Sequence, residues 1–175
     1  MKEIRKLFPA IENFRAYLDT ASTGLVPSTV HRALVEVLDS LTANPGIEDL
    51  VVDYTSRARS ELASLVGATP EEIAFTVRTT EGLKNVLRSI RVGPGDTVVG
   101  VDMDFPTVTS LVESLCRARG CRVRVVGGRG IYTTEDLRKS LDDSAKAVVI
   151  SSVQWISGWR VDLGELSDAA HERGA

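Results

Sequence analysis

Three short segments of the sequence carry side chains that could contact a flat, phosphorylated ligand. Residues 76–82 (TVRTTEG) place the hydroxyls of Thr79 and Thr80 where an expected strand runs into an expected helix. Phe105 supplies an aromatic ring after a second expected strand, and Gln154 supplies an amide after a later one. A hydroxyl-rich helix start suits a phosphate, a ring suits stacking, and an amide suits a ring substituent. Together the segments predict a site for an anionic, ring-bearing small molecule.

Each of these residues also has a purely structural interpretation. Thr79 could simply cap the helix that follows it. Phe105 could pack as a hydrophobic staple ahead of the next helix. The two tryptophans beside Gln154 could be packing residues at a subunit surface, and Arg160 could form an ion pair with Asp162. The prediction therefore rests on the agreement of three segments rather than on any one residue.

Alternating strands and helices are expected to position the three segments. Runs rich in β-branched residues predict strands over 73–77, 97–101, 122–126 and 146–152. Apolar residues with a period of 3.6 predict helices over 80–90, 107–119, 134–141 and 162–173. This order predicts a three-layer α/β fold, with a mainly parallel sheet and helices on both faces. Ligands of such sheets bind beyond the carboxyl ends of the strands, where all three segments fall.

The chain before residue 73 has a different pattern. Residues 1–16 form a mixed arm, and an extended piece over 17–24 runs into a loop of small residues. Two amphipathic helices follow, the first beginning near Ser28 and the second ending at Gly67.

Composition argues against several classes of function. The net charge is −3 and the basic residues are scattered, which does not suit a nucleic-acid surface or a polybasic membrane surface. No apolar run is long enough to span a bilayer. Cys116 and Cys121 are not expected to form a disulfide framework, and His31 and His171 lie on expected helices without other metal ligands. We therefore expect a cytoplasmic protein that binds no nucleic acid, membrane or metal.

Four motifs, in the right order, resemble the class V aminotransferase-like enzymes, which include cysteine desulfurases, selenocysteine lyases and isopenicillin N epimerase relatives. Residues 17–27 (YLDTASTGLVP) resemble the family's Y-L-D-N-A-A-T-G opening, and residues 75–82 (FTVRTTEG) resemble its F-T-R-G-T-T-E phosphate loop. Residues 104–106 (DFP) resemble an E-F-P segment, and residues 151–163 (SSVQWISGWRVDL) resemble an S-S-V-Q-x-x-S-G-x-R-V-D-L block. The resemblance implies an incomplete large domain of the fold-type-I enzymes that depend on pyridoxal 5'-phosphate (PLP).

Carried over onto this chain, the resemblance implies a PLP site. Thr80 would bond the phosphate, and Thr79 would supply a backbone N–H. Phe105 would stack on the pyridine ring, and Gln154 would lie near the ring hydroxyl. Two departures are visible: Arg78 stands where the family usually has glycine, and Phe105 replaces the histidine of the main desulfurase branch.

The resemblance also implies two parts of the chain. Residues 1–28 would form an N-terminal arm with a substrate-side loop, and residues 29–175 would form the N-terminal part of the PLP-binding large domain. The family's Schiff-base lysine, the aspartate that pairs with the pyridine nitrogen and the substrate-binding arginine come further along. None of the five lysines in this chain matches the family's Schiff-base lysine. We therefore expect no catalytic residue in this chain and no activity from it alone.

The function that these observations favour is the N-terminal part of a PLP-dependent enzyme acting on an amino acid, of the cysteine desulfurase or selenocysteine lyase type. An isopenicillin N epimerase-like enzyme is one alternative. A split-enzyme subunit and a non-catalytic remnant are others. The expected partner is a second copy of the chain in a homodimer, or a complementing C-terminal polypeptide.

Overall fold

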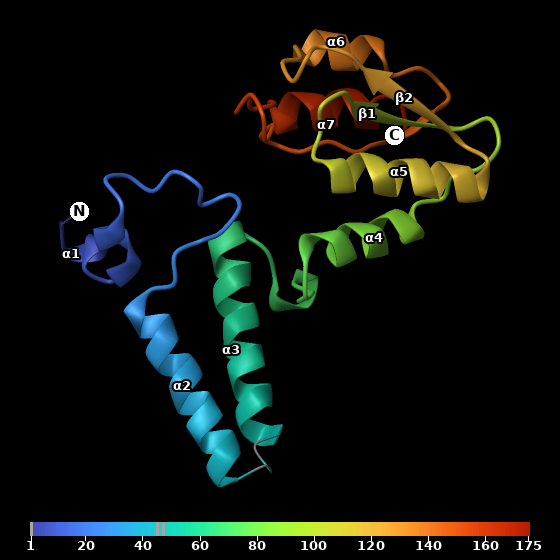
Figure 1. Ribbon diagram of the computed structural model, residues 1–175. Helices are drawn as coiled ribbons and strands as arrows, with labels where there is room; N and C mark the ends of the chain where they lie inside the picture. Colours follow the sequence, from blue (N-terminus) through green and yellow to red (C-terminus); the bar gives the residue numbers. More distant parts are fainter. Residues whose placement is uncertain (1, 45, 47) are drawn as a thin grey trace. The chain divides into compact units, whose positions relative to one another are not determined.

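The structure is a computed structural model that describes residues 2–44, 46 and 48–175 (Figure 1). Contacts within the chain divide it into two compact units, Met1–Ala74 and Phe75–Ala175. The division of the chain at residue 28 that the sequence suggests remains a prediction. No helix of the described residues is long and apolar enough to cross a membrane.

The first unit is helical. Its two long helices are α2 (Ser28–Ala43) and α3 (Glu48–Val66), and its short ones are α1 (Lys2–Arg5), η1 (Pro9–Asn13) and η2 (Pro70–Glu72). Both long helices were expected from the apolar period. Gly67 follows α3 with a φ of +71°, a left-handed conformation that glycine adopts without strain and that commonly ends a helix.

The second unit is an α/β layer structure. Three parallel strands lie in the order β2-β1-β3, namely β1 (Thr97–Val101), β2 (Arg122–Val126) and β3 (Ala145–Val148). The helices are α4 (Thr79–Ser89), α5 (Pro106–Arg119), α6 (Thr134–Lys139) and α7 (Leu163–His171). All four match helices expected from the sequence to within a few residues, so the predicted alternation is confirmed from β1 onward.

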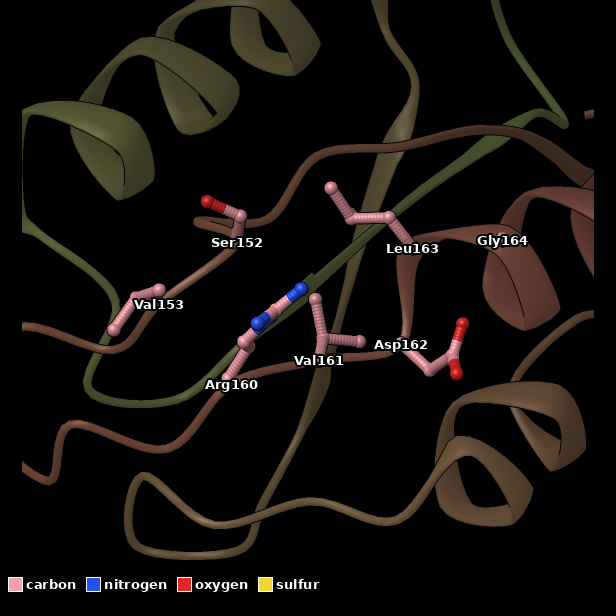
Figure 2. A pocket seen from close by; sticks show the side chains of 7 residues that line it. All are labelled: Ser152, Val153, Arg160, Val161, Asp162, Leu163 and Gly164. Carbon is pink, nitrogen blue, oxygen red and sulfur yellow. The ribbon is translucent and has the colours of Figure 1, made fainter.

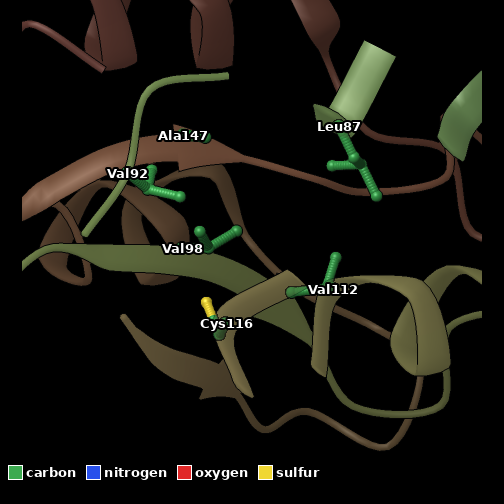
Figure 3. Close-up of a cluster of buried hydrophobic side chains, with 6 residues drawn as sticks. All are labelled: Leu87, Val92, Val98, Val112, Cys116 and Ala147. Atoms are coloured by element: carbon green, nitrogen blue, oxygen red, sulfur yellow. The ribbon is translucent and has the colours of Figure 1, made fainter. Parts of the chain in front are cut away.

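The strand β1 forms the middle of the sheet and has a core on each face. Val98 packs with residues of α4 and α5, as Figure 3 shows for Leu87, Val112 and Cys116. The next residue along, Val99, points to the opposite face and packs with α7. Because side chains of a strand alternate between faces, one buried strand joins the two helical layers. The predicted three-layer arrangement is confirmed.

The strand expected over residues 73–77 is not formed, and this prediction is wrong. In the described part of the chain, none of residues 73–77 belongs to a strand, and Val77 is 87% exposed. Its β-branched and aromatic residues suit a strand, but a strand also needs a neighbour for its N–H and C=O groups. The last expected strand is also shorter than predicted, because regular pairing ends at Val148.

The structure also corrects the expectation about the cysteines, since Cys116 and Cys121 form a disulfide with Cα atoms 4.5 Å apart. Gly120, with a φ of +76°, ends α5 and reverses the chain directly into β2. This reversal brings Cys121 back to the last turn of the helix. The spacing of the two residues alone does not reveal such a contact, because it depends on the left-handed turn between them.

Candidate cofactor-binding site

The expected phosphate loop leads into the start of α4. Arg78 is the N-cap residue, with extended backbone angles, so Thr79 and Thr80 are the first two residues of the helix. The alternative that Thr79 serves only as the N-cap is therefore wrong. The N–H groups of a first helical turn have no acceptor within the helix and carry positive partial charge. Thr79 and Thr80 thus lie where an anion would be stabilised.

Local contacts fix the path of this loop. The Thr76 hydroxyl donates to the Arg78 carbonyl at 3.3 Å, and the Glu81 carboxylate accepts from the Val77 N–H at 3.3 Å. A Cβ atom added at Gly82 would lie 3.2 Å from Thr76 Oγ1, which is tighter than ordinary van der Waals contact. A residue without a side chain therefore suits this close approach of the helix to the loop.

Phe105 lies between β1 and α5, as the N-cap residue of the helix. Its side chain is 48% exposed, and its ring meets the ring of Trp155 at a centroid distance of 5.6 Å and an interplanar angle of 81°. Edge-to-face contacts of this kind hold an aromatic ring in one orientation. The exposed half of Phe105 leaves surface on which a flat ligand could stack.

Gln154 is held in a tight loop after β3. Its N–H donates to the Trp159 carbonyl at 2.8 Å, and the Gly158 N–H donates to the Gln154 carbonyl at 2.8 Å. The side chain is only 1% exposed, yet within the described chain neither Oε1 nor Nε2 has a hydrogen-bond partner. A buried polar group without a partner costs about 1–3 kcal/mol. Near the carboxyl edge of the sheet, a buried water or a polar ligand could supply the missing partner.

A set of hydrogen bonds braces the neighbouring loop through Asp102. Its carboxylate accepts from the N–H groups of Gly128, Arg129 and Gly130 at 3.1, 3.2 and 3.3 Å, and from the Tyr132 hydroxyl. Burial by itself raises the pKa of Asp102, but these hydrogen bonds together outweigh it and leave the pKa lowered. Burial and the nearby Asp102 raise the pKa of Tyr132, so its hydroxyl remains a donor. These partners lie 26 to 30 positions away, so no local sequence pattern reveals them.

A cavity of about 550 Å³ lies between the loop after β3 and the start of α7 (Figure 2). It is lined by Ser152, Val153, Arg160, Val161, Asp162, Leu163 and Gly164. Within the described residues, Arg160 and Asp162 do not form the ion pair that the sequence suggested. Asp162 instead caps α7, because its carboxylate accepts the Glu165 N–H at 3.0 Å. The sequence did not predict this cavity, because it depends on the bridge between Val153 and Arg160 that folds the loop back.

The residues of the second unit fit the cofactor that the motifs imply. The start of α4 has no side-chain cap from Arg78, Phe105 offers a half-exposed ring, and Gln154 offers a buried amide without a partner in the described chain. In Figure 1 the N-terminal ends of α4 and α5 face the same side of this unit, as expected for helices that alternate with parallel strands. Phe105 and Gln154 thus follow β1 and β3 at one edge of the sheet, whereas Thr79 and Thr80 begin a helix that no strand of the described chain precedes.

Comparison with known proteins agrees with these motifs. The family model described as Aminotransferase class-V matches residues 16–175. The chain belongs to the aminotransferase class V family.

Within the class V family the chain is similar to proteins with several names. A probable cysteine desulfurase of Methanothermobacter thermautotrophicus is 29% identical over 99% of this chain and 45% of its own length. The cysteine desulfurase of Haloferax volcanii is 30% identical over 91% of this chain and 40% of its own length. A kynureninase of Shouchella clausii is 28% identical, over 93% and 41%. The chain therefore spans less than half the length of these curated relatives.

Solved structures confirm the predicted fold. The cystine C-S lyase C-DES, with glycine covalently linked to its PLP cofactor, superimposes with a TM-score of 0.86 at 20% identity, over 96% of this chain and 46% of that one. The apo cysteine desulfurase of Thermococcus onnurineus NA1 gives a TM-score of 0.83 at 23% identity, over 99% and 45%. The class V chain thus has part of the α/β fold of PLP-dependent enzymes.

Proposed function

We propose that this chain supplies the phosphate-binding and ring-contacting part of a PLP site in a class V enzyme that acts on an amino acid. The observation that carries the proposal is Gln154, whose buried amide has no partner within the described residues. A folded protein rarely leaves both polar atoms of a buried side chain unpaired unless a ligand completes them. The family membership and the PLP of C-DES name the ligand that fits.

In this proposal the residues of the chain hold and orient the cofactor. PLP supplies an electron sink for bonds broken at the substrate α-carbon. The first turn of α4, with Thr79 and Thr80, binds the phosphate, because its N–H groups and hydroxyls are donors. Phe105 packs against the ring and excludes water from that side, and Gln154 hydrogen-bonds a polar substituent of the ring.

The five lysines of the chain lie outside the three contact segments, residues 76–82, 104–106 and 151–161. We propose that the lysine that holds PLP covalently comes from polypeptide beyond these 175 residues, in the same chain or in a partner. The chain alone is accordingly proposed to bind PLP without turning over substrate. A homodimer is the proposed assembly.

The named desulfurases among the relatives favour L-cysteine as substrate, with alanine and transferred sulfur as products. A selenocysteine lyase would use the same site in the same way. Phe105 favours a second candidate, an epimerase-like enzyme, because it stands where the main desulfurase branch has a histidine that could move a proton.

The test is reconstitution of the full-length protein with PLP, followed by incubation with L-cysteine. We expect a visible-range absorption band on PLP addition, and formation of alanine from cysteine. With dithiothreitol present as the two-electron reductant, the transferred sulfur should be released as sulfide. Racemisation of an amino acid without sulfide release would instead favour the epimerase-like candidate. Absence of a protein-bound visible-range band after free PLP has been removed would contradict the proposed function.

A further inference from the structure

Asp104 connects the ends of two strands that carry the proposed ring contacts. It lies just beyond β1, and its side chain is only 4% exposed. One carboxylate oxygen, Oδ1, accepts from the Phe105 N–H at 2.7 Å and from the Ser151 hydroxyl at 2.5 Å. The other, Oδ2, accepts from the Ser151 N–H at 2.9 Å. A single buried carboxylate thus joins residues that are 47 positions apart in the sequence.

Each partner of Asp104 is rigidly connected to a proposed ring contact. On one side the partner is the backbone of Phe105 itself. On the other side, Ser151 begins the loop that holds Gln154, and the Val161 N–H closes that loop on the Ser152 carbonyl at 3.1 Å. Movement of Ser151 would therefore move the Gln154 side chain.

The same two loops also meet at their outer ends. The ring of Phe105 packs against the ring of Trp155, the residue that follows Gln154. The pair of loops is thus joined on the inside by the Asp104 carboxylate and on the outside by an aromatic contact. Both contacts restrain the separation between the ring of Phe105 and the amide of Gln154.

We propose that Asp104 is a positioning residue that sets the separation and orientation of Phe105 and Gln154 for a bound PLP ring. This inference rests on the proposed function. A carboxylate suits the role because all three partners are donors. An asparagine would keep one acceptor oxygen and turn an NH₂ group toward a donor, which leaves a buried N–H unpaired.

The experiment compares Asp104→Asn with Asp142→Asn in the full-length protein. Both changes remove a hydrogen-bonded carboxylate, but Asp142 lies just before β3, at the opposite end of the strand from Ser151, and bonds Arg124 and Ser144. PLP binding is followed by quenching of tryptophan fluorescence, and the orientation of the bound ring by its induced circular dichroism. We expect Asp104→Asn to weaken PLP binding by about 10-fold and to change the induced dichroism. Asp142→Asn should lower the melting temperature while leaving both PLP readouts near those of the wild type.

Equal effects of the two substitutions on PLP affinity and dichroism would overturn the inference, because Asp104 would then act only on stability. If Asp104→Asn does not fold, Ser151→Ala and Ser151→Thr take its place. Ser151→Ala removes the hydroxyl bond and should weaken PLP binding, whereas Ser151→Thr should retain it; wild-type affinity in Ser151→Ala would overturn the inference. Failure of the wild-type protein itself to bind PLP would instead refute the proposed function, and the inference with it.

Discussion

At the scale of single residues, the buried amide of Gln154 makes stability and ligand binding respond in opposite directions to one substitution. We expect Gln154→Leu to raise the free energy of unfolding of the cofactor-free protein by about 1 kcal/mol, because it removes an unpaired buried polar group. The same change should weaken PLP binding about 10-fold, since it removes a hydrogen-bonding group. Urea unfolding without PLP and a PLP titration measure the two effects.

Gln154→Met is the matched control, because it keeps the length of the side chain and also removes its polar atoms. Both variants should behave alike if the amide itself binds the cofactor. A Gln154→Leu protein that is much less stable and yet binds PLP normally would show that the amide has a structural partner instead.

Asp142 makes the free energy of unfolding depend on pH in the acidic range. Hydrogen bonds from Arg124, at 2.6 Å, and from Ser144 hold the pKa of the Asp142 carboxyl well below its ordinary value. A carboxyl whose pKa is lowered by folding stabilises the protein above its unfolded pKa of about 4, and that stabilisation is lost as the pH falls toward the folded pKa. We expect Asp142→Asn to be less stable than the wild type at pH 7, with the difference shrinking below pH 4.

Urea unfolding at a series of pH values checks this expectation. Asp143→Asn is the control, since it removes one charge at the next position. An Asp142→Asn protein with the same pH dependence as the wild type would contradict the assignment of the Arg124 contact.

At the scale of elements, the sequence predicted what depends on local pattern and missed what depends on distant partners. The helices α4 to α7 follow from apolar period and from glycines such as Gly120 that end them. The segment 73–77 has the composition of a strand, but pairing is a property of two segments and no local pattern reports it. The partners of Asp102 lie 26 to 30 positions away and Ser151 lies 47 positions from Asp104, so only the fold reveals them.

The disulfide between Cys116 and Cys121 joins the end of α5 to the start of β2. A short loop closed in this way restricts the unfolded chain, which stabilises the folded state by about 2 kcal/mol in the loop-entropy model. We expect dithiothreitol to lower the melting temperature of the wild type by several degrees. The double variant Cys116→Ser, Cys121→Ser should have the same melting temperature with and without dithiothreitol. A wild type whose melting temperature also does not change with dithiothreitol would show that the two thiols are not joined.

At the scale of the whole molecule, the chain provides contact groups for a cofactor but spans less than half the length of its relatives. Resemblance of motifs identified the family and the fold, which the family model and the C-DES structure confirm. The proposed site residues Thr79, Thr80, Phe105 and Gln154 remain predictions. Their burial, exposure and unpaired atoms are consistent with contacts to a cofactor.

The most direct test of this account is to locate the lysine that holds PLP. The full-length protein is loaded with PLP, reduced with sodium borohydride, digested and examined by mass spectrometry for a phosphopyridoxyl-lysine. The account predicts one labelled lysine outside residues 1–175, with labelling weakened in Gln154→Leu. A label on Lys84, Lys139 or Lys146, or no labelled lysine at all, would contradict it.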